Sequence, residues 1–284
     1  MVRRFRLVGS LFLVLGALTI SGCTSLFYYP RVPKVQIYDP SKMGLEPKNI
    51  EVAWAPGKSL HAWHFQARKS PSQGTIIHFH GNAENITTHF LNLVWVIEEG
   101  YDYIILDYPG YGLSDGEPSP KDNYLSSKAF VTYVHEKVDS RPLIFVGQSL
   151  GGNILLKTLE GLVGKVPIKS VIVDSTFRSY RSVARQKASE SWILWLLQPV
   201  AWLIMSDSYA PEIEGRLPGI PKLVIHGDQD RVVPFQNGEK VFSLMTEPKE
   251  FIKIAGGSHT DVFYREKGAY RQRILSWLRA NASQ

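Results

Sequence analysis

The sequence predicts an α/β fold with a mostly parallel central sheet that is covered by helices on both faces. Short, continuously apolar segments alternate along the chain with longer segments whose apolar residues recur at helical spacing. Strands that are apolar at every position are typical of parallel sheets, because helices bury both faces of such sheets. A chain of 284 residues with 44% hydrophobic residues is long and apolar enough for one large domain of this class.

An antiparallel hairpin is the first element of the predicted sheet. Ile50–Trp54 and Leu60–Gln66 alternate apolar and polar residues, and Pro56-Gly57 lies between them as a turn. We expect this hairpin to add antiparallel strands to one edge of the sheet.

Six strands and five helices are predicted after the hairpin. The strands are short apolar runs of the buried type, namely Thr75–His80, Tyr103–Leu106, Leu143–Val146, Ser170–Val173, Leu223–His226 and Phe251–Ile254. The helices follow a period of three to four residues, and their ranges are Asn85–Glu99, Asp122–Val138, Leu150–Leu159, Gly238–Met245 and Asp261–Arg279.

Residues 177–220 interrupt this alternation. Ser191–Met205 is strongly apolar and contains three tryptophans, but it has only 15 residues and Pro199 divides it. It is therefore a weak candidate for a membrane span. We expect a cap of two short helices over the sheet, which would also be placed to line an acyl-binding pocket or to touch lipid.

The N-terminus has the features of a secretory signal. Met1–Arg6 is basic, Leu7–Ile20 is a largely apolar run, and small residues follow. A helix of 14 residues extends about 21 Å, whereas the core of a bilayer is about 30 Å thick. The segment is thus shorter than an ordinary membrane span.

Residues 20–23, Ile-Ser-Gly-Cys, resemble the bacterial lipobox. The resemblance implies a signal peptide at 1–22 and a lipid anchor on Cys23, which is the only cysteine of the chain. Thr24 follows instead of an aspartate, which in a Gram-negative bacterium implies the outer membrane. An uncleaved anchor is the alternative, since no charge occurs from Leu7 to Tyr29. Both interpretations predict an exported protein that is tethered to a membrane of the cell envelope.

The predicted organisation is therefore a signal peptide (1–22), a proline-containing tether or arm (23–48) and one globular domain (49–284) with its cap at about 177–220. The net charge is +6, and three of the positive charges are Arg3, Arg4 and Arg6. No run of Lys and Arg is long enough to follow a phosphate backbone, which argues against nucleic acid as a partner. A single cysteine excludes an intrachain disulfide and a cysteine-based zinc site.

A Gly-x-Ser-x-Gly motif, Gly147-Gln148-Ser149-Leu150-Gly151, lies between a predicted strand and a predicted helix. A nucleophile elbow requires this strand-turn-helix setting. We expect the two terminal glycines to allow the strand and helix to approach closely. The hydroxyl of Ser149 would then lie at the carboxyl end of the sheet, beside the positive end of the helix.

A serine nucleophile needs a base and an acid that orients the base. After a nucleophile elbow the chain order is serine, acid, histidine. His259 is the only histidine that follows the last predicted strand, so it is the predicted base. Asp228 and Asp230 both follow the strand Leu223–His226, and spacing alone does not separate them as the acid.

Five segments together make the chain similar to serine hydrolases of the α/β-hydrolase superfamily. They cover about residues 50–280 in the order of that family, and they are HGNAEN (80–85), DYPGYGLSDGEPS (107–119), GQSLGG (147–152), HGDQDRVVP (226–234) and GGSH (256–259). The nearest resemblance is to small-cap, membrane-associated members with an HGN oxyanion loop. The resemblance implies Asp230 as the acid, with Asp228 as the minority alternative.

The resemblance also implies an oxyanion hole that consists of the backbone N–H groups of Leu150 and Asn82. The loop lacks the HGGG sequence of many lipases, so its geometry follows less directly from the family. We expect the loop that begins at Asp107 to line the pocket. His78 and His80 lie on one face of a strand, but no third ligand accompanies them, and no metal is predicted.

The expected activity is hydrolysis of a carboxylic ester or thioester through an acyl-enzyme intermediate, with no metal or organic cofactor. The expected partner is a small-molecule or lipid acyl ester. Two alternatives stay open. The same three residues would serve an amidase or peptidase, and a hydrolase scaffold without turnover would serve as a surface binding module.

Overall fold

The computed structural model describes residues 27–30, 35–189 and 195–281. The predicted signal peptide at 1–22 and the predicted lipidation site Cys23 lie outside the described residues. Within the described part of the chain, no helix combines the length and the apolar character that crossing a membrane requires.

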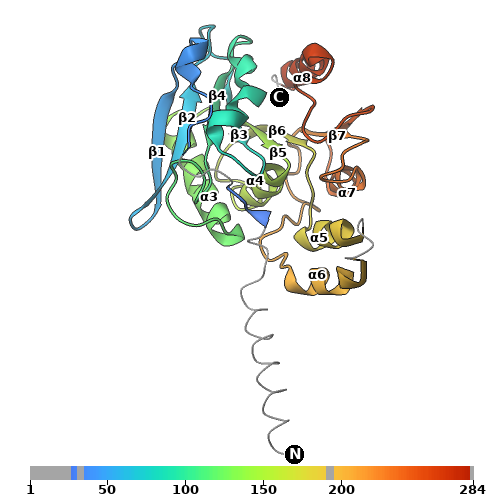
Figure 1. Cartoon of the computed structure of the whole chain (residues 1–284). Coiled ribbons are helices and arrows are strands. Elements are labelled where there is room, and N and C mark those ends of the chain that lie inside the picture. Colours follow the sequence, from blue (N-terminus) through green and yellow to red (C-terminus); the bar gives the residue numbers. More distant parts are fainter. Residues whose placement is uncertain (1–26, 31–34, 190–194, 282–284) are drawn as a thin grey trace, which may run out of the picture.

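The described residues form one sheet of eight strands in the order β1-β2-β4-β3-β5-β6-β7-β8. The pairs β1–β2 and β2–β4 are antiparallel, and all the other pairs are parallel. This confirms the α/β fold class, with the hairpin at one edge of the sheet (Figure 1). The strands are β1 (Lys48–Ala55), β2 (Lys58–Phe65), β3 (Thr75–Phe79), β4 (Asp102–Leu106), β5 (Leu143–Gln148), β6 (Ile168–Asp174), β7 (Lys222–Gly227) and β8 (Lys249–Ile254).

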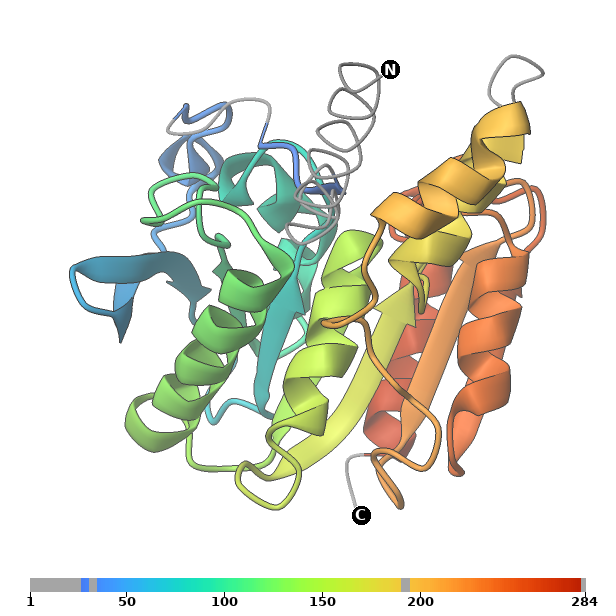
Figure 2. The ribbon, with the colours of Figure 1, turned by 90° about the horizontal axis from the view of Figure 1, so that it is seen from below.

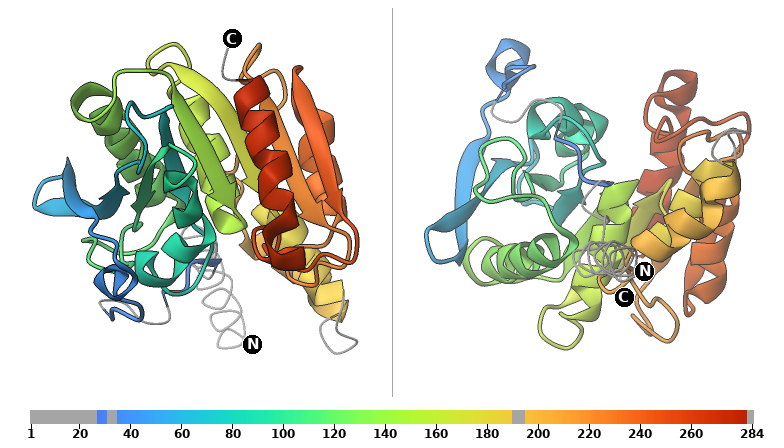
Figure 3. Two further views of the ribbon diagram at one scale, coloured as in Figure 1. Left: turned by 90° about the horizontal axis from the view of Figure 1, so that it is seen from above. Right: turned by 60° about the horizontal axis from the view of Figure 1, so that its bottom comes forward.

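Helices cover both faces of this sheet. One face packs against α3 (Pro120–Lys137), α4 (Leu150–Glu160) and α7 (Gln236–Leu244), as Figure 2 shows. The opposite face packs against α8 (Ala269–Ala280) and the segment 86–97 (Figure 3). Two apolar cores result, one on each side of strands that are buried along their length. The carboxyl ends of the parallel strands all lie at the same end of the sheet. Loops that follow these strands can bring together side chains from distant parts of the sequence.

The helix predicted over Asn85–Glu99 is not continuous. It consists of α2 (Ile86–His89) and two 3₁₀ helices, η3 (Phe90–Asn92) and η4 (Val94–Ile97). The hydroxyls of Thr87 and Thr88 bond to Asn85 at the start of the segment, a local alternative to regular helix pairing. The apolar residues of the segment still reach the core, which is why the periodicity predicted a helix here.

The prediction that the last helix begins at Asp261 is also wrong. Regular helix begins only at Ala269, after the 3₁₀ turn η6 (Arg265–Gly268). Glu266 and Lys267 have left-handed φ values of 50° and 55°, which an α-helix does not accommodate. Residues 261–264 instead belong to the loop that follows β8.

The segment between β6 and β7 contains two short helices, α5 (Tyr180–Ser189) and α6 (Gln198–Ile204), with the 3₁₀ turn η5 (Trp195–Leu197) before α6. Figures 1 and 2 show them beyond the carboxyl ends of the parallel strands, with α6 outermost. The described part of the predicted tether packs against the domain. Tyr28 and Leu45 are buried, and residues Pro40–Met43 form the 3₁₀ helix η2.

Candidate active site

Ser149 occupies a tight turn between β5 and α4. Its backbone has φ 52° and ψ −121°, a conformation that costs free energy for any residue with a side chain. A Cβ at Gly151 would lie 2.1 Å from the carbonyl oxygen of Phe79, and a Cβ at Gly147 would lie 2.6 Å from the Cα of Gly152. Both positions therefore require glycine, as the elbow interpretation predicted.

Hydrogen bonds fix this strained turn. The amide of Ser149 donates to the carbonyl of Asp174 over 2.8 Å. The carbonyl of Ser149 accepts from the hydroxyl of Thr176 over 2.7 Å and from the amide of Gly152 over 3.1 Å. The neighbouring strand β6 thus holds the serine in a backbone conformation that would otherwise relax.

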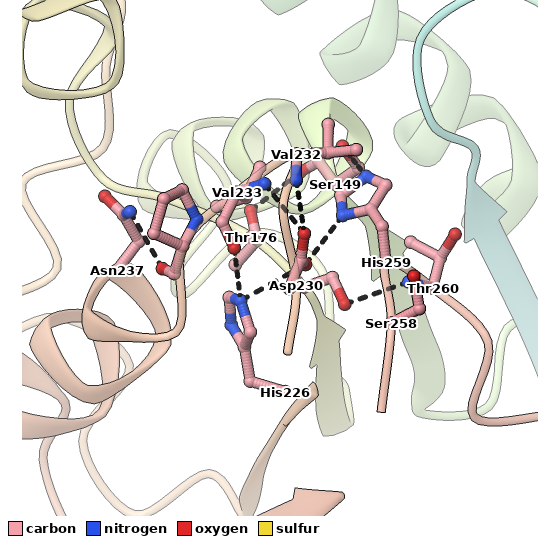
Figure 4. A network of polar contacts seen from close by, with 12 residues as sticks. Ser149, Thr176, His226, Asp230, Val232, Val233, Asn237, Ser258, His259 and Thr260 are labelled. Carbon is pink, nitrogen blue, oxygen red and sulfur yellow. Dashed lines mark hydrogen bonds and ion pairs between the residues drawn. The ribbon is translucent and has the colours of Figure 1, made fainter. Parts of the chain in front are cut away.

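The three residues predicted to act together lie in one hydrogen-bonded row (Figure 4). The Oγ of Ser149 is 2.9 Å from the Nε2 of His259, although 110 residues separate them in the chain. The Nδ1 of His259 is 2.7 Å from the Oδ2 of Asp230. Ser149, Asp230 and His259 follow the carboxyl ends of β5, β7 and β8, and these ends lie on the same side of the parallel sheet, with only β6 between β5 and β7.

The carboxylate of Asp230 is buried and held on both oxygens. Its Oδ1 accepts the backbone amides of Val232 and Val233 over 2.8 and 2.9 Å, and its Oδ2 faces His259. Burial acts to raise the pKa of Asp230, but the contacts with His226, His259 and the Val233 amide outweigh it and keep this pKa well below the ordinary value. Asp230 is thus held ionised beside the imidazole.

Asp228 faces a different environment. Its Oδ1 accepts the amide of Gly256 over 2.7 Å, and its Oδ2 lies 3.4 Å from the Nζ of Lys253. The geometry therefore separates the two aspartates that spacing alone left equivalent, and it favours Asp230 as the partner of His259.

The loop after β3 borders the serine on its other side. Gly81 and Asn82 line the same pocket as Ser149, and a Cβ at Gly81 would lie 3.6 Å from the serine Cβ. The side chain of Asn82 is anchored, because its Oδ1 accepts the amide of Tyr29 and the hydroxyl of Tyr111, both over 2.8 Å. Leu150, whose amide was predicted as the second oxyanion donor, follows Ser149 at the start of α4.

The loop that begins at Asp107 packs against the loop 80–85 that follows β3. Tyr108 donates to the carbonyl of His80 over 2.8 Å, and Tyr111 donates to Asn82. The pocket that contains Ser149 has a volume of about 560 Å³, and no residue of the 107–112 loop is among its lining residues. The expectation that this loop lines the pocket is therefore wrong, since it contacts the 80–85 loop through Tyr108 and Tyr111 instead.

Several supporting residues were not predicted from the sequence. Gln148 bridges His78 and Asp174, because its Oε1 lies 3.1 Å from the His78 Nε2 and its Nε2 donates to Asp174 over 2.9 Å. His89 contacts the carbonyl of Ala83 through Nε2 over 3.0 Å, and burial lowers the pKa of His89 to about 3, so it stays neutral. The chain carries no signal for these contacts apart from the position of Gln148 inside the Gly-x-Ser-x-Gly motif.

Both ring nitrogens of His78 contact other side chains of the protein. Its Nδ1 is 2.8 Å from the hydroxyl of Tyr103, and its Nε2 faces Gln148. Across the described ranges, no three side chains of the metal-binding types come together. Asp174, an alternative acid by its position, accepts hydrogen bonds from Gln148 and Ser175 and so belongs to the support of the elbow.

Comparisons with known proteins agree with this architecture. The sequence profile of the alpha/beta hydrolase fold family matches residues 74–180. The chain is 32% identical over 272 residues to the uncharacterised protein YfhR of Salmonella typhi, a match that covers 90% of this chain and 88% of the relative. The chain is an α/β hydrolase of the YfhR family.

More distant similarities of this α/β hydrolase extend to proteins with a stated activity. It is 25% identical to the lysophosphatidylserine lipase ABHD12 of Danio rerio, over 78% of this chain and 61% of that protein. The Pyrococcus furiosus esterase Pf2001 has the same fold, with a TM-score of 0.67 over 89% of this chain and 98% of the esterase, at 17% identity. The chain is therefore a hydrolase by family, and esterases are among the proteins that share its fold.

Proposed function

We propose that this α/β hydrolase is a serine hydrolase that cleaves carboxylic esters through Ser149, His259 and Asp230. The observation that carries the proposal is the continuous row from the Ser149 hydroxyl to the His259 imidazole and on to the Asp230 carboxylate, with distances of 2.9 and 2.7 Å. These distances support the assignment of the three residues as nucleophile, base and orienting acid for acyl transfer.

Each group has one task in the proposed reaction. Ser149 Oγ attacks the ester carbonyl carbon while the Nε2 of His259 takes the hydroxyl proton. The N–H groups of Asn82 and Leu150 bind the oxyanion of the tetrahedral intermediate. The intermediate collapses, and the imidazolium returns the proton to the departing alcohol. Water then attacks the acyl-enzyme by the same route, which releases the carboxylic acid and restores the serine.

Acyl esters are the substrates that the comparisons favour. Pf2001 is an esterase, and ABHD12 is a lysophosphatidylserine lipase. We propose carboxylic esters, including lipid esters, as the first choice and thioesters as the second. Neither chemistry needs a metal or an organic cofactor, because the three side chains and two amides supply every proton transfer and charge contact.

Labelling with a fluorophosphonate probe tests the proposal directly. Such a probe reacts with a serine only when a base activates it, so the wild-type protein should be labelled and Ser149→Ala should not. Absence of labelling in folded wild-type protein would support the non-catalytic binding module instead. Turnover of peptide or amide substrates in preference to a series of acyl esters would identify an amidase or peptidase.

We further propose that the chain is exported and tethered to a membrane of the cell envelope through a lipid on Cys23. The basic and apolar N-terminal sequence and the lipobox-like residues 20–23 support this. Mass spectrometry of the protein from its native host should find a mature chain that begins at an acylated Cys23. An intact, unmodified N-terminus that still begins at Met1 would support the uncleaved anchor.

A further inference from the structure

The outermost part of the cap leaves an apolar face uncovered. Five large apolar side chains of η5 and α6 are between 42% and 76% exposed, and they are Trp195, Leu196, Val200, Trp202 and Leu203. These side chains belong to η5 and α6, which follow each other directly in the chain and contain no charged residue. Four of them surround a shallow hollow of about 700 Å³ together with Pro199.

A contiguous face of this kind differs from the ordinary exposure of single apolar residues. Leu113 and Val163, by contrast, are exposed with no other exposed large apolar residue within the ten described positions on either side of them in the chain. Monomeric proteins seldom leave a gathered apolar patch in water unless the patch binds a partner. The two tryptophans in this patch have the amphipathic ring that prefers the boundary between water and hydrocarbon.

The side chains beside the patch are positively charged and would be attracted to an anionic surface. Helix α5, which packs beside α6, carries Arg181, Arg185 and Lys187 and no acidic residue. The guanidinium of Arg181 lies 5.8 Å from the centre of the Trp202 ring, and Arg185 lines the apolar hollow. Apolar side chains bordered by long basic ones are the combination that binds the surface of a bilayer with anionic lipids.

The first described residues of the chain pack against α5, which is the helix beside α6. Phe27, the first described residue, stacks edge-on against Tyr180 at a ring distance of 5.3 Å, and Tyr28 shares a 2.5 Å hydrogen bond with Tyr180. Cys23 is only a few positions before Phe27, a reach of at most about 14 Å for an extended chain. An anchor at Cys23, or one that ends at Ile20, would therefore hold the cap near the membrane.

We propose that the apolar face of η5 and α6 docks into the headgroup region of an anionic bilayer, beside the N-terminal anchor. The anchor alone would allow many orientations, and this second contact selects the one in which the cap and the carboxyl ends of the strands face the lipid. The proposal rests on the proposed membrane tether, but the contact itself does not depend on hydrolytic activity.

A fluorescent probe on the patch tests this orientation in the full-length chain. The protein is reconstituted into vesicles of phosphatidylcholine and phosphatidylglycerol, and Leu203→Cys carries a polarity-sensitive dye. Val163→Cys is the matched control, because Val163 is an exposed apolar residue just beyond the far end of α4. Unsubstituted protein, labelled in parallel, corrects for dye on Cys23.

The dye at 203 should be quenched by nitroxide-labelled lipids and protected from aqueous iodide, and the dye at 163 should show the reverse. Equal iodide quenching at both positions would overturn the proposal. So would protection of the dye at 203 in detergent without vesicles together with crosslinking between copies, which would assign the patch to self-association.

A second variant separates docking from chemistry. Leu196→Glu/Leu203→Glu should lower turnover of an ester embedded in vesicles about tenfold, because two apolar side chains no longer enter the interface. Turnover of a short, water-soluble ester should not change. Equal turnover of the embedded ester by this variant and wild type would contradict docking. If the wild type hydrolyses neither ester, the proposed function fails, and the quenching experiment still decides the docking proposal.

Discussion

At the scale of single residues, Asp230 and Asp228 are two positions apart in the chain but face different partners. Asp230 meets His259 over 2.7 Å, whereas Asp228 meets the amide of Gly256 and lies near Lys253. Asp230→Asn would leave the shape of the site in place but would favour the wrong imidazole tautomer. We expect kcat/KM for a soluble ester to fall about 10⁴-fold.

Asp228→Asn is the matched control for this prediction, since it makes the same chemical change two residues away. We expect its kcat/KM to stay within a few-fold of wild type, about what a lost surface ion pair produces. A larger loss in Asp228→Asn than in Asp230→Asn would reverse our assignment of the acid.

The three residues of the hydrogen-bonded row were predictable because their patterns are local. Ser149 lies in a five-residue motif between a strand and a helix, and His259 and Asp230 each follow a strand that the apolar pattern identifies. Thr176 and His89 were not predictable in the same way. Thr176 bonds to the carbonyl of Ser149 in another loop, and His89 bonds to the carbonyl of Ala83 across an irregular stretch of its own segment. Both contacts depend on the three-dimensional path of the backbone, which no residue pattern reveals.

At the scale of elements, the elbow depends on the distance between the start of α4 and the end of β3. Gly151→Ala would place a methyl group 2.1 Å from the Phe79 carbonyl oxygen, so helix and strand would have to separate. We expect a loss of about 3 kcal/mol or more in the free energy of unfolding. Urea denaturation followed by circular dichroism measures it.

Gly215→Ala is the comparison for Gly151→Ala. Gly215 has φ 69°, and no atom lies within 4 Å of the position that an alanine methyl group would take there, so only the cost of the left-handed backbone applies. That cost is about 1 kcal/mol. If the two variants lose equal stability, close packing is not what fixes glycine at position 151.

Strands were easier to predict than helices in this chain. Strands β3 to β7 are buried over most of their length, so their composition alone marks them, and the observed strands lie within a few residues of the predicted ranges. The segments 85–99 and 261–279 have helical periodicity as well, but the side chains of Asn85 and Asp261 accept hydrogen bonds from nearby residues and shape loops beside the site. Periodicity reports which residues are buried and does not report these local bonds.

At the scale of the whole molecule, buried tyrosines link stability to pH. Burial raises the pKa of Tyr103, Tyr108 and Tyr180 well above the ordinary value of 10.0. Since these folded-state pKa values exceed the unfolded ones, their contribution to stability is complete below about pH 10 and is lost as the pH rises.

We therefore expect the melting temperature to fall steeply above about pH 10, with each of these tyrosines contributing up to about 1.4 kcal/mol per pH unit. Scanning calorimetry between pH 8 and pH 11 measures this dependence. Tyr180→Phe keeps the ring but removes one titrating group, so its profile should be flatter. An unchanged slope in Tyr180→Phe would show that this tyrosine does not contribute.

The N-terminal arm also has a practical consequence. Tyr29 donates its amide to Asn82, and Phe27 and Tyr28 pack on Tyr180, so the first described residues join the loop beside Ser149 to the cap. Proteolytic trimming beyond Pro30 would remove that brace. Soluble preparations intended for assay or crystallisation should accordingly start upstream of Phe27, or their low turnover will be mistaken for a poor choice of substrate.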